Sequence, residues 1–308
     1  MEKHMETEIA AINQQSFKDK IKSYTKHPGS FLLLLLVLVA AVLTVGVLVF
    51  LVGYILIRGI PYLKTSLFAW TYNSDNVSML PAMINTLFMT VLALLLSVPF
   101  GVGAAIYLVE YAKKGNKLVG IIRVTAETLS GIPSIIYGLF GMLFFVTALK
   151  WGYSMMAGAA TLAIMVLPVI MRTTEEALLC VPDSFREGSF GLGAGKLRTI
   201  FKIVLPSAIP GILSGIILAI GRIVGETAAL IYTSGTVANL AGFFDSGRTL
   251  AIHMYSLSRE GMHTNEAYAT AVVLLIVVLI INGVSSLIAK KFEAVSYTHL
   301  TLPTKLEV

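Results

Sequence analysis

The sequence predicts an all-α membrane protein with six transmembrane helices, and its composition and its apolar runs are the two observations that predict it. Of its 308 residues, 56% are hydrophobic and only 13% are charged, which is far from the balance of a soluble domain. Stretches without charge reach or approach the roughly 20 residues that cross a bilayer as a helix. We expect six spans, at residues 27–57, 76–109, 128–149, 151–171, 203–221 with a continuation from 227, and 267–289.

Basic residues predict the orientation of these spans. Sixteen Lys and Arg lie in the N-terminal arm, the second and fourth connections and the end of the last span, against five on the alternate side. Because connections rich in Lys and Arg stay in the cytoplasm, we expect both termini there. The net charge of +6 then reflects topology. The basic residues are scattered over separate loops, so we expect contact with the lipid bilayer and not with nucleic acid.

The two ends of the chain differ from the region between them. We expect a cytoplasmic arm at residues 1–30, a six-span domain at 31–291 and a tail at 295–308. The first apolar run, residues 31–57, is 27 residues long, which is too long for a cleaved signal peptide, so we expect it to be retained. The tail changes abruptly to β-type residues with a proline and resembles read-through of cloning or adapter DNA, so it is excluded from the prediction of the fold.

Residues that bind metals or form disulfides are sparse. The single Cys180 excludes an intramolecular disulfide. His253 and His263 lie in the predicted outer loop, residues 236–266, without another ligand at metal-binding spacing, so we expect solvated histidines and no metal site. The same loop mixes polar and apolar residues, and we expect it to contain a helix and to dock an external partner.

The longest predicted inner connection, residues 172–202, is rich in glycine. A phosphate-binding loop would need Gly at Phe190 and Ser or Thr at Leu197. The glycines instead predict a break between two short helices. Apolar residues around the break recur at spacings of four and three, which predicts one face of an amphipathic helix; they are Phe190, Ala194, Leu197, Phe201 and Val204. Such a face suits either lipid headgroups or a groove in a partner protein.

A spaced motif in this connection resembles the cytoplasmic loop of ABC-importer permeases. The pattern is Glu187, then Gly193 six residues on, then nine residues before Ile203, Leu205 and Pro206. Glu187, Gly188 and Ser189 stand where the family has Glu-Ala-Ala. The resemblance implies a type I, MetI-like permease fold. It also implies that residues 182–205 form a coupling helix that enters a cleft on an ATPase subunit.

Four further stretches resemble the A-type permeases of the phosphate-specific ABC import system, at residues 85–112, 127–141, 157–178 and 215–235. The resemblance implies phosphate as the cargo and the bacterial cytoplasmic membrane as the location. The implied partners are a homologous C-type permease, an ATPase dimer and an external phosphate-binding protein. ATP would bind to the ATPase partner, so we expect no cofactor and no catalytic residue in this chain.

Two charges interrupt the fifth apolar run in the segment "GRIVGET", residues 221–227. If the span starts near Ser207, Arg222 lies about 22 Å along the helix, in the outer half of the membrane. A charge near the bilayer centre costs about 2.5–3.5 kcal/mol, so Arg222 should face a partner or a wet cavity. An ion pair with Glu226 at i+4 is the alternative, but it is worth only about 0.2–0.5 kcal/mol on an isolated helix.

We therefore expect Arg222 to donate to phosphate, Glu226 to hold it when no anion is present, and Thr227 to supply a hydroxyl. Pro133 predicts a helix break at which Ser134 contacts the anion, with a simple packing kink as the alternative. Pro99 and Pro168 likewise predict kinks or breaks.

Two other functions stay open: a permease for another oxyanion, and a self-sufficient channel or proton-coupled carrier with Arg222 and Glu226 as a relay.

Overall fold

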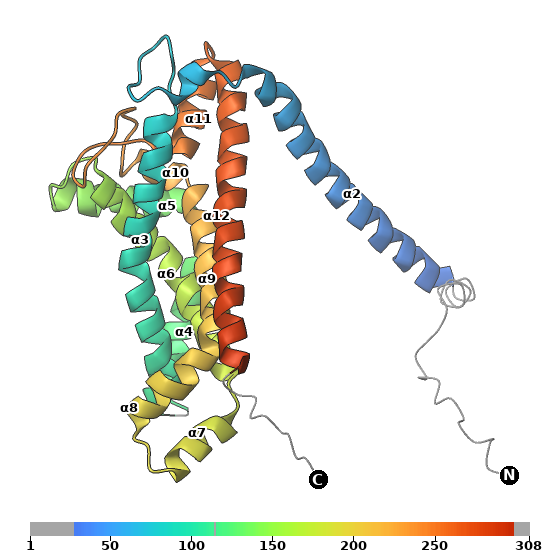
Figure 1. The fold of residues 1–308 in the computed structure, drawn as a ribbon, viewed down its shortest axis with the longest axis vertical. Helices are drawn as coiled ribbons and strands as arrows, with labels where there is room; N and C mark the ends of the chain where they lie inside the picture. Colours follow the sequence, from blue (N-terminus) through green and yellow to red (C-terminus); the bar gives the residue numbers. More distant parts are fainter. Residues whose placement is uncertain (1–27, 114, 299–308) are drawn as a thin grey trace. The chain divides into compact units, whose positions relative to one another are not determined.

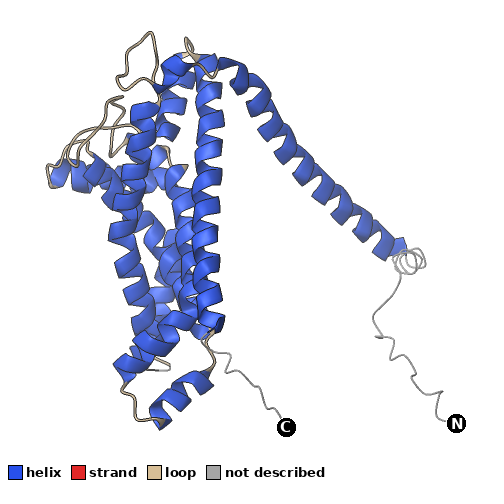
Figure 2. Ribbon diagram, viewed as in Figure 1, coloured by secondary structure: helices blue, strands red, loops and turns tan. Residues whose placement is uncertain are grey.

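The computed structural model describes residues 28–113 and 115–298, and within these ranges every regular element is a helix (Figure 2). The chain divides into two compact units, one ending at Ile57 and the other beginning at Arg58. In the first unit, α2 (Pro28–Gly59) carries no charged residue before Arg58. Its side chains are exposed along nearly the whole helix. A helix that is hydrophobic all round suits a lipid environment.

The second unit contains the remaining helices, which Figure 1 labels in chain order. Its long helices are α3 (Leu80–Ile106), α4 (Lys117–Ser130), α6 (Met155–Leu179), α9 (Leu205–Val224) and α12 (Thr264–Thr298). Shorter helices are α5 (Ser134–Gly141), α7 (Asp183–Gly191), α8 (Lys196–Thr199), α10 (Ala228–Ile231) and α11 (Leu250–Glu260). Two 3₁₀ turns, η1 (Ile60–Tyr62) and η2 (Thr65–Phe68), and three π-helical turns, η3 (Tyr107–Tyr111), η4 (Met142–Ala148) and η5 (Ile200–Val204), complete it.

Membrane-spanning helices agree with the predicted number when one bent pair is taken as one span. Among the described residues, five helices are long and apolar enough to cross a bilayer. The bent pair consists of α4 and α5 with η4, which meet at 100° across a short break. Pro133 lies in this break as the residue before α5, so the predicted helix break there is confirmed. Pro99 and Pro168, in contrast, lie inside α3 and α6, which continue through them.

The helices of the third and fifth spans begin earlier than the predicted spans. The third span begins at Lys117 and not at residue 128, because α4 includes the charged Arg123 and Glu127. The helix that contains the fifth apolar run is continuous from Lys196 to Val224, and it extends beyond both ends of the predicted span, residues 203 and 221. Arg222 therefore lies in the last turn of a long helix.

The packed centre of the second unit is formed by α3, α6 and α9. Helix α6 is the most buried span, with 67% of its apolar window inside the protein. Small residues allow the close approach of its neighbours: a Cβ on Gly101 of α3 would lie 2.8 Å from Ile170, and a Cβ on Gly211 of α9 would lie 2.5 Å from Ala177. Glycine at helix contacts is a common device for packing spans in membranes, where backbones must approach closely.

The predicted outer loop contains the expected helix, α11, and is fixed to α3 by Asn85. The Asn85 amide donates to Asn239 O at 2.9 Å and accepts from Ala241 N at 3.1 Å. The expectation of a solvated His253 is wrong, because its side chain is fully buried on α11. Burial, together with the nearby Arg248 charge, lowers the pKa of His253 to about 3.

Candidate functional site

The glycine-rich connection folds as two short helices with a break between them, as predicted. Helix α7 ends at Gly191, and α8 begins at Lys196 after the N-cap residue Gly195. In the break, Gly193 has φ +82°, a left-handed conformation that strongly favours glycine. The two helices lie together at one end of the second unit, and α11 lies toward the other end (Figure 1). We call residues 183–204 the α7–α8 loop.

The loop is braced from within and against the rest of the protein. A hydrogen bond of 2.8 Å between the hydroxyls of Ser189 and Thr199 joins α7 to α8, and both residues are buried. Arg186 of α7 forms an ion pair with Glu110 of η3 at 2.8 Å. Both partners are largely buried, with 14% and 9% of their side chains exposed. A shape held by buried polar contacts suits a surface that must present fixed side chains to a partner.

The motif residues take different positions in this loop. Glu187 and Gly188 are exposed on α7, whereas Ser189 is buried. Ile203, Leu205 and Pro206 are half-buried at the junction of η5 and α9. The motif therefore joins an exposed glutamate, a turn that needs glycine and the packed start of a long span.

Four large apolar side chains of the loop are exposed: Phe190 by 47%, Leu192 by 91%, Leu197 by 63% and Phe201 by 53%. The prediction that Phe190, Ala194, Leu197, Phe201 and Val204 share one helical face is wrong. The glycine break separates Phe190 from Leu197, Ala194 lies in the break, and Val204 is fully buried. The apolar surface is instead built from both short helices and the turn between them. Large apolar side chains left exposed on a connecting loop suit contact with a partner protein or with lipid.

The segment "GRIVGET" is the end of one helix and the approach to the next. Helix α9 ends at Val224 with Gly225 as its C-cap, and α10 begins at Ala228. The Glu226 carboxylate accepts a hydrogen bond of 3.0 Å from the backbone N–H of Ala229. Neither a hydrogen bond nor an ion pair joins Glu226 to Arg222 in the described structure. The expectation that Glu226 holds Arg222 is wrong, because the helix that would place them at i and i+4 on one face ends between them.

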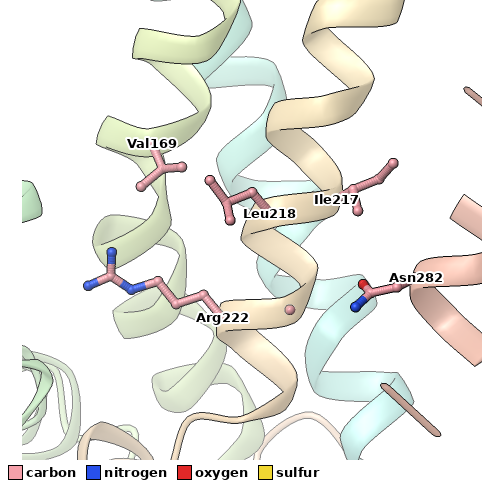
Figure 3. A pocket seen from close by; sticks show the side chains of 6 residues that line it. Val169, Ile217, Leu218, Arg222 and Asn282 are labelled. Carbon is pink, nitrogen blue, oxygen red and sulfur yellow. The ribbon is translucent and has the colours of Figure 1, made fainter. Parts of the chain in front are cut away.

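Arg222 lines a cavity of about 480 Å³ between α6, α9 and α12. Its other lining residues are Val169, Ile217, Leu218, Gly221 and Asn282. Figure 3 shows the Arg222 side chain extending from α9 toward α6, whereas Asn282 comes from α12 on the other side of α9. The described residues place no carboxylate in ion-pair contact with Arg222. Among the described residues, no hydrogen bond is formed by the guanidinium donors of Arg222 either.

The other predicted path residues do not line this cavity. Ser134 begins α5 and is half-buried, and Thr227 lies in the gap before α10. Helix α5 does pack against α10, since a Cβ on Gly138 would lie 2.8 Å from Ala229 Cα. The Tyr137 phenol of α5 is also within electrostatic range of Arg222. Ser134 and Arg222 thus belong to neighbouring elements without sharing one pocket.

Sequence reasoning missed three features. Asn282 lines the Arg222 cavity, and a polar residue within the sixth apolar run was the signal that could have found it. Two ion pairs were also missed: Arg186 with Glu110, and Arg123 of α4 with Glu175 of α6 at 2.5 Å. The partners of these pairs are distant in the sequence, so local spacing gives no signal for either.

The described residues form a multi-pass bundle of membrane helices with the braced α7–α8 loop at one end. The family model described as "Binding-protein-dependent transport system inner membrane component" matches residues 97–294. The chain belongs to this family, and it is a permease component of an ABC importer.

Curated relatives agree with this assignment. The chain is 35% identical over 281 residues to the "Probable ABC transporter permease protein YqgI" of Bacillus subtilis, covering 85% of this chain and 94% of the relative. It is 36% identical over 225 residues to the "Phosphate transport system permease protein PstA 1" of Mycobacterium tuberculosis, covering 72% of each. A PstA protein of Yersinia pestis is 37% identical over 204 residues, covering 65% of this chain and 68% of the relative.

Solved structures share the fold at low sequence identity. A bacterial alginate ABC transporter, in complex with an alginate-bound periplasmic protein, matches with a TM-score of 0.65 and 15% identity, covering 87% of this chain and 97% of that chain. The inward-facing MetNI methionine transporter matches with a TM-score of 0.55 and 21% identity, covering 69% and 93%. The predicted MetI-like permease fold is therefore confirmed.

Proposed function

We propose that this chain is the A-type permease half of an ATP-driven importer of inorganic phosphate. Its proposed partners are a homologous C-type permease, an ATPase dimer and an external phosphate-binding protein. The observation that carries the proposal is the α7–α8 loop, which combines the importer motif with exposed apolar side chains on a braced support. Relatives named as phosphate permeases favour phosphate as the cargo.

In this proposal the α7–α8 loop docks on the ATPase subunit at the cytoplasmic face, so both termini are cytoplasmic. Leu192 and Phe201 would supply apolar contacts, because exposed apolar side chains gain free energy when a partner covers them. The exposed Glu187 would add a polar contact at the edge. Closure of the ATPase dimer would then move the loop and, through it, the membrane helices.

Arg222 would be the phosphate-binding side chain of the path. A guanidinium presents a planar set of donors that matches the oxygens of phosphate. Since no carboxylate of the described chain neutralises Arg222, its charge would attract the anion without first breaking an ion pair. Glu226 would act indirectly, by capping α10 through Ala229 N. Ser134 and Thr227 remain candidate contacts for an anion that moves on from the cavity.

A second candidate is a permease of the same class for another oxyanion. It rests on a relative that aligns with 85% of this chain and whose name gives no cargo. A self-sufficient carrier that uses Arg222 and Glu226 as a proton relay has less support, because neither a hydrogen bond nor an ion pair joins the two side chains in the described structure.

Purification of the assembled complex tests the proposal. The proposal predicts that an ATPase subunit and an external binding protein purify with the chain. It further predicts that phosphate-loaded binding protein stimulates ATP hydrolysis more than binding protein loaded with sulfate or molybdate. Stimulation by sulfate or molybdate alone would favour the second candidate, and a chain that purifies without any ATPase would contradict both.

A further inference from the structure

A buried cluster of contacts joins the α7–α8 loop to the ends of two long helices. The Arg186 guanidinium of α7 donates to Glu110 Oε1 through Nε at 3.0 Å and through Nη2 at 2.8 Å. Glu110 lies in η3, the π-helical turn that continues α3. The side chains of both residues are largely buried. The first contact of the cluster therefore connects the loop to the end of α3.

The same guanidinium also holds the end of α6. Arg186 Nη1 donates to Val181 O at 2.7 Å, and Nη2 donates to Leu178 O at 3.0 Å. Carbonyls in and just after the last turn of a helix lack the regular helical partner. Leu178 O also accepts from the backbone N–H of Val181 at 3.3 Å, so Arg186 adds a second donor there and supplies a side-chain donor to Val181 O. One side chain thus binds α3, α6 and α7 together.

A second contact reaches the same turn from the other side of the glycine break. The Lys196 ammonium of α8 lies 4.8 Å from the centre of the Tyr111 ring, which is within the range of a cation–π interaction. Tyr111 follows Glu110 directly in η3. The Ser189–Thr199 hydrogen bond also joins α7 to α8. Both short helices therefore contact η3, the turn at the end of α3.

We propose that Arg186 is a positioning residue that transmits movement of the α7–α8 loop to α3 and α6. This inference rests on the proposed function of the loop. A buried ion pair is costly to break, because each partner left alone is an uncompensated charge. Movement of α7 should therefore carry the ends of α3 and α6 with it. The exposed pair between Arg172 and Glu176, with 58% and 64% of its side chains exposed, offers a matched comparison, because such pairs contribute little.

The test uses the complete complex in proteoliposomes and measures labelled inorganic phosphate transported per ATP hydrolysed. Arg186→Lys keeps the charge beside Glu110 but replaces the planar fork by a single ammonium, so we expect transport per ATP to fall about tenfold while ATP hydrolysis continues. The double variant Glu110→Ala/Arg186→Ala leaves no buried charge unpaired, because Asp183, which also pairs with Arg186 at 3.2 Å, is exposed, and we expect a similar fall. Arg172→Lys is the control and should stay within about twofold of the unmodified complex.

The ratio of transport to hydrolysis separates transmission from stability. A variant that merely destabilises the complex lowers both rates together and leaves the ratio unchanged. An unchanged ratio in an assembled Arg186→Lys or double variant would overturn the inference. Failure of both variants to assemble would also overturn it, because the cluster would then serve assembly alone. If the unmodified complex hydrolyses ATP without moving phosphate, the proposed function fails instead.

Discussion

Replacement of Arg222 gives the most specific prediction about the translocation path. Arg222 is the only charged residue of α9 and makes no ion pair in the described structure. An anion in the cavity would gain two charge-assisted hydrogen bonds from it, each worth about 1.5–3 kcal/mol. Arg222→Ala should therefore cost about 3 kcal/mol of phosphate interaction. Because each 1.4 kcal/mol is about tenfold, phosphate uptake at low concentration should fall about 100-fold.

Two companion variants make this prediction sharper. Arg222→Lys keeps the charge but loses the fork, so we expect a smaller fall of about tenfold. Glu226→Gln keeps an oxygen that accepts from Ala229 N, so uptake should change by less than about fivefold, the equivalent of 1 kcal/mol. The assay is ATP-dependent uptake of labelled phosphate by complexes matched for assembly. Equal losses in Glu226→Gln and Arg222→Ala would refute the reasoning, because they would show that the two charges act as a pair.

Three further predictions concern the loop and the buried histidine. Leu192→Asp replaces the most exposed apolar side chain of the loop by a charged one. We expect the permease still to fold but ATPase subunits no longer to co-purify with it, and retained ATPase binding would contradict the docking surface. Gly193→Ala should destabilise the loop by about 1–3 kcal/mol because of the positive φ at this position. Gly188→Ala should stabilise helix α7 by about 0.5–1 kcal/mol, because a Cβ there meets open space. Thermal denaturation of the complex compares the two variants. Since His253 has a pKa of about 3 in the folded protein and about 6.5 when unfolded, the unfolded chain binds more protons between these values. Stability should then fall by about 1.4 kcal/mol per pH unit as pH drops below 6.5, and His253→Phe should reduce this slope in thermal denaturation measured across that range.

Much of the fold follows from sequence alone because its signals are local. Apolar length marks the spans, Pro133 marks the bend between α4 and α5, and the glycines mark the break at Gly193. The start of α4 was missed because its charged Arg123 is compensated by Glu175 on another helix. A rule that ends a span at the first charge fails wherever the charge finds a distant partner.

The candidate site was predicted less completely, for a related reason. The sequence identifies Arg222 as a charge that should face a partner or a wet cavity. Whether it pairs with Glu226 depends on where α9 ends. Gly225 ends that helix and redirects Glu226 to the N–H of Ala229. The burial of His253 and the Arg186–Glu110 pair likewise depend on packing between segments that are far apart in sequence. Such contacts are set by the tertiary arrangement and leave no periodic pattern.

Labelled phosphate uptake into proteoliposomes that contain the complete complex tests the central claim most directly. We predict uptake that requires ATP on the side of the ATPase and binding protein on the other side. We also predict that a large excess of sulfate or molybdate leaves this uptake unchanged. Phosphate uptake that a proton gradient drives without ATP would contradict the assignment of this chain as the permease half of an ATP-driven phosphate importer.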